Sequence, residues 1–444
     1  MKRQTISLAA INGALVLLAG LVLGLATAVR AAEPVALDVL VAEIVARNPE
    51  MRFYEAEIAA ARGGRMTAGA WANPELSGEL GHKQVHDLSG NDLGDGPVWS
   101  VSLSQTFEFP GRLGLRKAIA NRQIEMAELG LAQFRAALAM RARALGYQLL
   151  AAQQRAEAAG EVAKRFQDLL ATLVQRDVAG VAPMLETRII EASAFTLNRR
   201  SSEAAIATHN AQFELNQLRG LPVSTPVEIA RTPLVLRPSP QLETLFATAR
   251  ERNFELRSRV TELEQQGLRV ALSKNERWPS VTIAPYVADE KGSDRELRYG
   301  LGVTVPLSVL NRNAGAIETA KARESQAEVA LTVALREVER KIAAARNAYD
   351  TFLAEIGTWP PDAVQKFRDA ARLGDQHYRL GALPIATYTE LQKQYLDAVD
   401  ALLGTQADAL DARQQLALLT GLKLDDPPTA FPAEESTAST PVRK

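Results

Sequence analysis

The sequence predicts a mostly helical α+β chain that is built from two copies of one large unit. Three observations support this fold class. Similar segments recur about 200 residues apart, far more than the roughly 20 to 50 residues of a solenoid repeat. Each copy contains two stretches in which apolar and polar residues alternate, as in β-strands with two different faces. Most of the remaining sequence repeats apolar or alanine residues at helical spacing.

The N-terminus predicts a secretory signal peptide over residues 1–32. Lys2 and Arg3 precede an apolar run at 14–29, and small residues follow that run. We expect cleavage after Ala31 or Ala32. A retained membrane anchor is the alternative, although the run is shorter than the roughly 20 residues that a spanning helix needs. The mature chain is therefore expected beyond the inner membrane.

The repeat is visible in matching segments. ARNPEMR (46–52) is matched by ERNFELR (251–257), and LRGLP (218–222) is matched by LTGLK (419–423). A segment with five prolines, 222–240, joins the two copies. The predicted division is a signal peptide (1–32), a first repeat (33–222), a proline-rich connector (223–240), a second repeat (241–424) and a disordered tail (425–444).

Four predicted strands carry alternating apolar and polar residues. They cover about 74–82 and 98–109 in the first copy, and about 279–288 and 298–307 in the second. Trp71, Trp99 and Trp278 lie at their borders. Short alternating segments with aromatic borders are typical of transmembrane β-barrels, although a soluble sandwich also alternates. Four strands cannot close a barrel, and lipid does not tolerate an open sheet edge. If the strands span a membrane, several chains must therefore contribute, and three chains would give twelve strands.

Long helices are predicted after each pair of strands. From Leu145 to Leu173, apolar or alanine residues recur at alternating steps of four and three, which indicates packing of the coiled-coil type. The two helical hairpins are predicted over 112–219 and 312–420. A continuous helix from Arg112 to Val178 would be about 100 Å long at roughly 1.5 Å per residue. In the second copy GTWPPD (357–362) contains two prolines, which must kink or break the helix.

Composition excludes several classes of function. The net charge is −1 and no basic stripe is concentrated anywhere, so a nucleic-acid partner is not expected. The absence of cysteine excludes disulfides and thiolate metal sites. The four histidines are scattered, and we find no catalytic constellation, metal site or cofactor motif, so no enzyme is expected. The histidines are His82, His86, His209 and His377.

With the repeat, the strand pairs and the long helices in place, the mature chain resembles the TolC family of outer-membrane export ducts. The resemblance implies a homotrimer in outer-membrane lipid, with a 12-stranded barrel continued by a coiled-coil tunnel in the periplasm. It also implies a periplasmic adaptor (membrane fusion) protein and an inner-membrane RND-type pump as partners. ANPELSGELG (72–81), LSQTFEFPGR (103–112) and VPLSVLNRNAGAIETA (305–320) are closest to the heavy-metal, CzcC-like branch. The implied function is passive export, with divalent heavy-metal cations as the expected cargo.

The resemblance also assigns a gate. YRLGALPIATYTEL (378–391) is similar to the periplasmic tip of the family, in which two acidic residues lie six and nine positions after a glycine. Counted from Gly381, those positions are Thr387 and Glu390, so one acid is kept and a ring of Glu390 would attract cations. Tyr378 matches the latch tyrosine of the family, and Glu186 is its expected partner. Leu383 replaces the family arginine, which removes one expected salt bridge.

Two further groups of residues are assigned structural roles. Gly180 with Pro183 and Gly381 with Pro384 mark helical turns that would face the adaptor. The passage from barrel to tunnel is expected at Pro110, Gly111 and Arg112 and at Asn311, Arg312 and Gly315.

Two alternatives to a metal duct stay open at this stage. One is a multidrug or organic-toxin duct of the same fold. The other is a periplasmic coiled-coil scaffold or adaptor without a pore, which would explain the helices and the signal peptide but not the four bordered strands.

Overall fold

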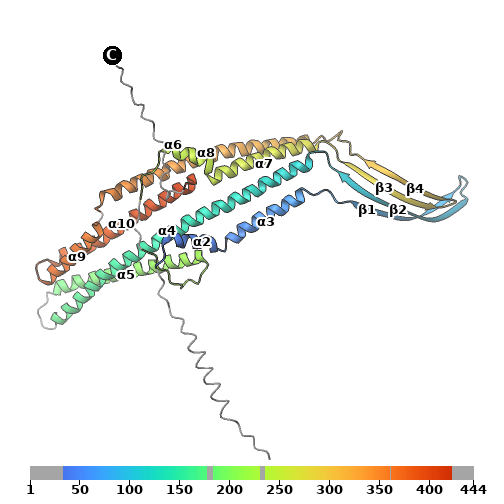
Figure 1. The fold of residues 1–444 in the computed structure, drawn as a ribbon. Helices are drawn as coiled ribbons and strands as arrows, with labels where there is room; N and C mark the ends of the chain where they lie inside the picture. The colour runs from blue at the N-terminus through green and yellow to red at the C-terminus, as the bar shows by residue number, and fades with distance from the viewer. Residues whose placement is uncertain (1–33, 178–183, 231–235, 361, 423–444) are drawn as a thin grey trace, which may run out of the picture.

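The structure, a computed structural model, describes residues 34–177, 184–230, 236–360 and 362–422. The predicted signal peptide, the predicted disordered tail and the first tip with Gly180 and Pro183 lie outside these residues. The described chain is elongated, with a sheet at one end and helical hairpins at the other (Figure 1). The expected mostly helical α+β architecture with four antiparallel strands is confirmed.

The same order of elements occurs in both halves. The first half contains α2 (Leu37–Arg47), α3 (Met51–Ala68), β1 (Glu75–His86), β2 (Asp92–Phe107), α4 (Arg112–Asp177) and α5 (Met184–Arg219). The second half contains α6 (Leu242–Arg252), α7 (Phe254–Glu276), β3 (Val281–Lys291), β4 (Arg295–Thr304), α8 (Ala314–Thr358), α9 (Ala363–Arg379) and α10 (Ile385–Thr420). The helix after β4 is split into α8 and α9 because Trp359 is extended before Pro360.

Equivalent asparagines fix equivalent joints in the two halves. Asn48 lies between α2 and α3, and its Nδ2 donates to the carbonyl of Leu218 at 3.0 Å. Asn253 lies between α6 and α7, and its Nδ2 donates to the carbonyl of Leu419 at 2.7 Å. Both asparagines are buried, so each hydrogen bond satisfies a polar side chain inside the core. The contact ties the start of each half to the end of its last helix.

The sheet has one apolar face and one polar face. Its strands follow the order β1-β2-β3-β4, all antiparallel. The register places Val101 opposite Val287, and Val287 opposite Tyr299, on the apolar face. The exposed apolar residues of this face are Leu76, Leu80, Trp99, Val101, Leu103, Phe107, Val281, Val287, Leu297, Tyr299, Leu301 and Val303. Hydroxyl groups pair across the other face, as in the 2.7 Å contact of Ser77 with Ser102.

The strands are longer than predicted at the end of the sheet that is remote from the helices. β2 begins at Asp92, before its predicted start at about residue 98. Gly94 and Gly96 interrupt the alternation of apolar and polar residues there, but β2 still pairs with β1. A Cβ at Gly96 would lie 2.8 Å from the Cβ of Lys291, so the glycine permits a close approach of β2 and β3. Within the described residues, neither β1 nor β4 has a strand on its outer edge.

The helices form a wall that continues the sheet. Next to the sheet α3, α4, α7 and α8 lie side by side in that order, and further away α4 and α5 pack with α9 and α10 (Figure 1). Most of the predicted coiled-coil positions of α4 are buried, whereas Ala156 and Leu170 are half-buried. The buried positions are Leu145, Leu149, Ala152, Ala159, Ala163 and Phe166. None of the described helices combines the length and the apolar character that crossing a membrane requires.

Candidate functional site: the sheet junction and the helical tip

The first passage from sheet to helix is anchored to the end of α7. Gly111 has a φ of +87°, which the absence of a Cβ allows, and turns the chain from β2 into α4. Arg112 then donates to the carbonyl of Trp278 at 2.8 Å and to Asn275 Oδ1 at 3.2 Å. Asn275 Nδ2 in turn donates to the carbonyl of Pro110 at 3.0 Å. The expected passage residues of the first half therefore form one connected joint.

The second passage uses a residue that sequence reasoning did not single out. Asn313 precedes α8 with a φ of +59°, and its Nδ2 donates to the carbonyl of Ser273 at 2.9 Å. The side-chain oxygen of Asn311 accepts from the backbone N–H of Asn313 at 3.0 Å. Arg312 is exposed, and Gly315 lies in the first turn of α8. Asn313 is the residue that ties this passage to α7, and the N-R-N spacing was its only sequence signal.

The described tip is the turn between α9 and α10. Gly381 has a φ of +75°, and Pro384 is the N-cap of α10. Thr387 and Glu390 are exposed on the first turns of α10, and Gln394 donates to Glu390 Oε1 at 2.7 Å. Thr387 and Glu390 border an open hollow of about 610 Å³ whose other lining is mainly apolar, including Phe367 and Leu391. Glu390 is thus an exposed carboxylate at the border of this hollow, with one hydrogen bond from its own helix.

Three aromatic rings hold the tip together. Tyr388 of α10 is fully buried and stacks on Phe166 of α4, with ring centroids 5.1 Å apart. Tyr378 of α9 stacks on the other side of Tyr388 at 4.9 Å. The Tyr388 hydroxyl donates to Asp375 at 3.0 Å, and burial, followed by the nearby Asp375 carboxylate, raises the pKa of Tyr388. Tyr378 is therefore part of the packing at the tip; its expected hydrogen bond to Glu186, in the first turn of α5, stays a prediction.

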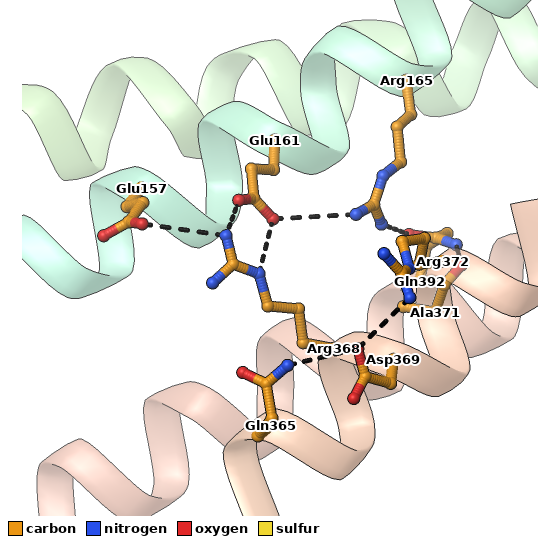
Figure 2. A network of polar contacts seen from close by, with 9 residues as sticks. All are labelled: Glu157, Glu161, Arg165, Gln365, Arg368, Asp369, Ala371, Arg372 and Gln392. Carbon is orange, nitrogen blue, oxygen red and sulfur yellow. Dashed lines mark hydrogen bonds and ion pairs between the residues drawn. The ribbon is translucent and has the colours of Figure 1, made fainter.

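A polar network also links α4 to α9 and α10 (Figure 2). The guanidinium of Arg368 donates to both carboxylate oxygens of Glu161, through Nε at 3.1 Å and through Nη2, and Nη2 lies 3.8 Å from Glu157. Arg165 donates to Gln392 Oε1 at 3.2 Å. Gln392 is fully buried and donates to the carbonyl of Ala371 at 2.6 Å. We call Arg368, Glu161, Arg165 and Gln392 the clasp.

A second cluster joins α5 to α10. Arg200 of α5 pairs with Asp397 at 3.0 Å and with Asp400 of α10, and Arg155 of α4 lies 3.2 Å from Asp400. Neither this cluster nor the clasp followed from the sequence, because each joins residues about 200 positions apart. The available signal was the run of Glu157, Glu161 and Arg165 at four-residue spacing, which places three charges on one face of α4. The tip in this structure is thus held by contacts between the two halves.

Metal-ligating groups do not gather anywhere in the described chain. No group of three or more histidine, aspartate or glutamate residues there could hold an ion. His82 pairs with Asp95 at 2.9 Å near the far end of the sheet, as a cross-strand contact of β1 and β2.

Known proteins match part of this sequence and the fold. Residues 40–221 match the outer membrane efflux protein family. No curated protein matches the chain in sequence. The solved structures with the same fold include the Campylobacter jejuni CmeC outer membrane channel, which is 14% identical with a TM-score of 0.72 and matches 87% of this chain and 85% of its own.

Two other solved structures agree. The Neisseria gonorrhoeae MtrE outer membrane channel in its open state is 17% identical with a TM-score of 0.66, over 87% of this chain and 88% of MtrE. CusC is 14% identical with a TM-score of 0.68, over 86% of this chain and 91% of CusC. The described fold is therefore that of solved outer-membrane channels, and residues 40–221 carry the sequence pattern of the outer membrane efflux protein family.

Proposed function

We propose that this chain is an outer membrane efflux protein of the TolC type, which acts as the passive export duct of a tripartite pump. The observation that carries the proposal is the sheet. One face is apolar and exposed, the other is polar, and the edges of β1 and β4 are unpaired within the described residues. Backbone groups cannot stay unpaired in lipid, so a sheet that meets lipid with its apolar face must close on itself.

Closure requires other copies of the chain. β4 of one copy would pair with β1 of the next, and three copies would form a 12-stranded barrel whose polar face lines the pore. The helical wall continues the sheet directly (Figure 1), so the same three copies would form the tunnel. Heat-sensitive trimers in unheated gels of purified outer membranes, with monomers after boiling, support this assembly. Recovery of the protein only in the soluble periplasmic fraction would favour the coiled-coil adaptor instead.

The tip is the proposed gate and docking end. Glu390 and Thr387 would line its narrowest part, while Tyr378 and Glu186 would form a latch between α9 and α5. The turn with Gly381 and Pro384, together with the first tip around Gly180 and Pro183, would contact a periplasmic adaptor that also binds an inner-membrane RND-type pump. The exposure of Glu390 supports its assignment.

The cargo has two candidate classes. The resemblance of the strand and junction segments to the CzcC-like branch favours divalent heavy-metal cations as cargo. A ring of Glu390 would attract such cations. Organic compounds are the second class, and a hollow in the helical wall that Arg116, Arg269 and Arg323 line favours them. Deleting the gene and comparing growth on zinc, cobalt, cadmium and copper salts with growth on dyes and antibiotics separates the two. Loss of metal tolerance alone supports the first class, and loss of tolerance to organic compounds alone supports the second.

A further inference from the structure

A hollow of about 880 Å³ lies in the helical wall next to the sheet. Residues of α3, α4, α7 and α8 line it, and these helices lie side by side in that order. Because the two outermost helices, α3 and α8, both contribute to the lining, the wall is curved and the hollow is on its concave side. The volume is within the range of roughly 300 to 1,000 Å³ that small-molecule sites occupy.

The charged groups in the lining are all arginines. They are Arg116 of α4, Arg269 of α7 and Arg323 of α8, and none of the lining residues is acidic. Arg116 forms an ion pair at 2.5 Å with Glu108, the residue that follows the end of β2. No carboxylate pairs with Arg269 or Arg323 in the described parts of the chain; Arg269 donates only to Gln265 of its own helix at 3.4 Å. Arg269 is half-buried and Arg323 is exposed, so the hollow has two arginines without a carboxylate partner in the described chain.

The rest of the lining is small, apolar or amide-bearing. The small and apolar members include Ala60, Ala120, Ile119, Leu272, Ala316 and Ala320. Buried polar atoms normally have a hydrogen-bond partner, yet Nε of Arg116 and Oε1 of Gln266, both from lining residues, have none in the described structure. Glu324, which is also outside the lining, has its Oε1 next to Gly267 of α7. A lining that combines apolar side chains with guanidinium groups suits one kind of ligand.

We propose that this hollow binds small organic anions, with an aromatic or aliphatic body against the alanine-rich part of the lining and a carboxylate or sulfonate bound by Arg269 and Arg323. Guanidinium groups form strong, charge-assisted hydrogen bonds with such anions, and they repel bare divalent cations. The inference deepens the proposed function, on which it rests for its meaning, because the concave side of a closed tunnel faces the cargo. It favours organic anions as cargo.

The test uses the purified full-length protein in detergent and isothermal titration calorimetry. The probe is 1-naphthalenesulfonate, and its cationic counterpart, 1-naphthyltrimethylammonium, reports binding through the ring alone. We expect the sulfonate to bind at least about tenfold more tightly than the cation. The double variant Arg269→Gln/Arg323→Gln should lose about tenfold in affinity for the sulfonate and little for the cation.

Two further variants make the result specific. Arg257→Gln/Arg336→Gln removes two exposed arginines from the same helices, α7 and α8, outside the hollow, and should leave sulfonate binding unchanged. Ala316→Trp fills the hollow from an exposed position and should weaken binding of both probes. Equal affinity for the two probes, or an equal loss in both double variants, overturns the inference. Trimer formation is measured on the same samples, so a failed duct and an empty hollow give different results.

Discussion

The clasp predicts a specific weakening of the tip. Replacing Arg368 by glutamine removes the guanidinium group that donates hydrogen bonds to both carboxylate oxygens of Glu161. Arg165, at 3.6 Å, is then the cationic partner that this carboxylate keeps. The side chains of Arg368 and Glu161 are 38% and 29% exposed, so the pair is intermediate between a surface pair and a buried one. We expect a loss of about 1 to 2 kcal/mol in the free energy of opening α9.

Hydrogen exchange measures that free energy directly. In the purified, assembled protein the amides of α9 (Ala363–Arg379) should exchange roughly 5 to 30 times faster in Arg368→Gln, while amides of α3 keep their rates. Arg372→Gln is the matched control, because Arg372 is 70% exposed and, among the residues that the structure describes, reaches only Asp369 of its own helix at 3.9 Å. Glu161→Gln combined with Arg368→Gln should add little to the single change. Unchanged exchange in α9, or an equal increase in the control, would refute the role of the clasp.

Substitutions at three other residues probe the tip. Tyr388→Phe removes the hydroxyl that donates to Asp375 but keeps the ring stack, so α10 should lose about 0.5 to 1.5 kcal/mol in opening free energy by hydrogen exchange, with Tyr388→Ala losing several times more. Tyr378→Phe should make the reconstituted duct leakier if the latch with Glu186 exists, and unchanged conductance rules that latch out. Glu390→Gln should shift the reversal potential of the channel in a salt gradient away from cation preference, whereas an unshifted potential places Glu390 off the conducting path.

The alternation of apolar and polar residues predicted the sheet because its two faces meet different surroundings. Trp99, Val101 and Leu103 share one face in the structure, as the period of two requires. The alternation of apolar and polar residues is lost between Asp92 and Val98. Glycines there let the backbone of β2 come close to the chain at the end of β3, and a glycine has no side chain from which strand pairing could be predicted. Boundaries at glycine-rich strand ends are therefore the part of the sheet that alternation could not define.

The helices were predictable from spacing, and their contacts were not. Buried Leu149 and Phe166 follow from the steps of four and three along α4. The partners of Glu161 and Arg200 lie on α9 and α10, and a sequence gives no geometry for pairs so far apart along the chain. Family resemblance directed attention to Tyr378 and Glu390, whereas packing made Tyr388 the centre of the tip.

The central claim, that several copies close one barrel through β1 and β4, has a direct test. The chain has no cysteine, so introduced pairs are the only thiols. Ser77→Cys on β1 is combined in turn with each of three cysteines on β4: Glu296→Cys, Arg298→Cys and Thr304→Cys. The three positions test different registers of β1 against β4 of a neighbouring copy. Within one chain β1 and β4 are three strand spacings apart, about 14 Å, too far for a disulfide.

Oxidation in outer membranes should therefore link only different copies. We predict that at least one pair gives a covalent trimer that survives boiling without reductant and returns to monomer with it. Adducts that stop at a dimer, or no adduct in any register while the thiols remain reactive, would contradict the closed barrel.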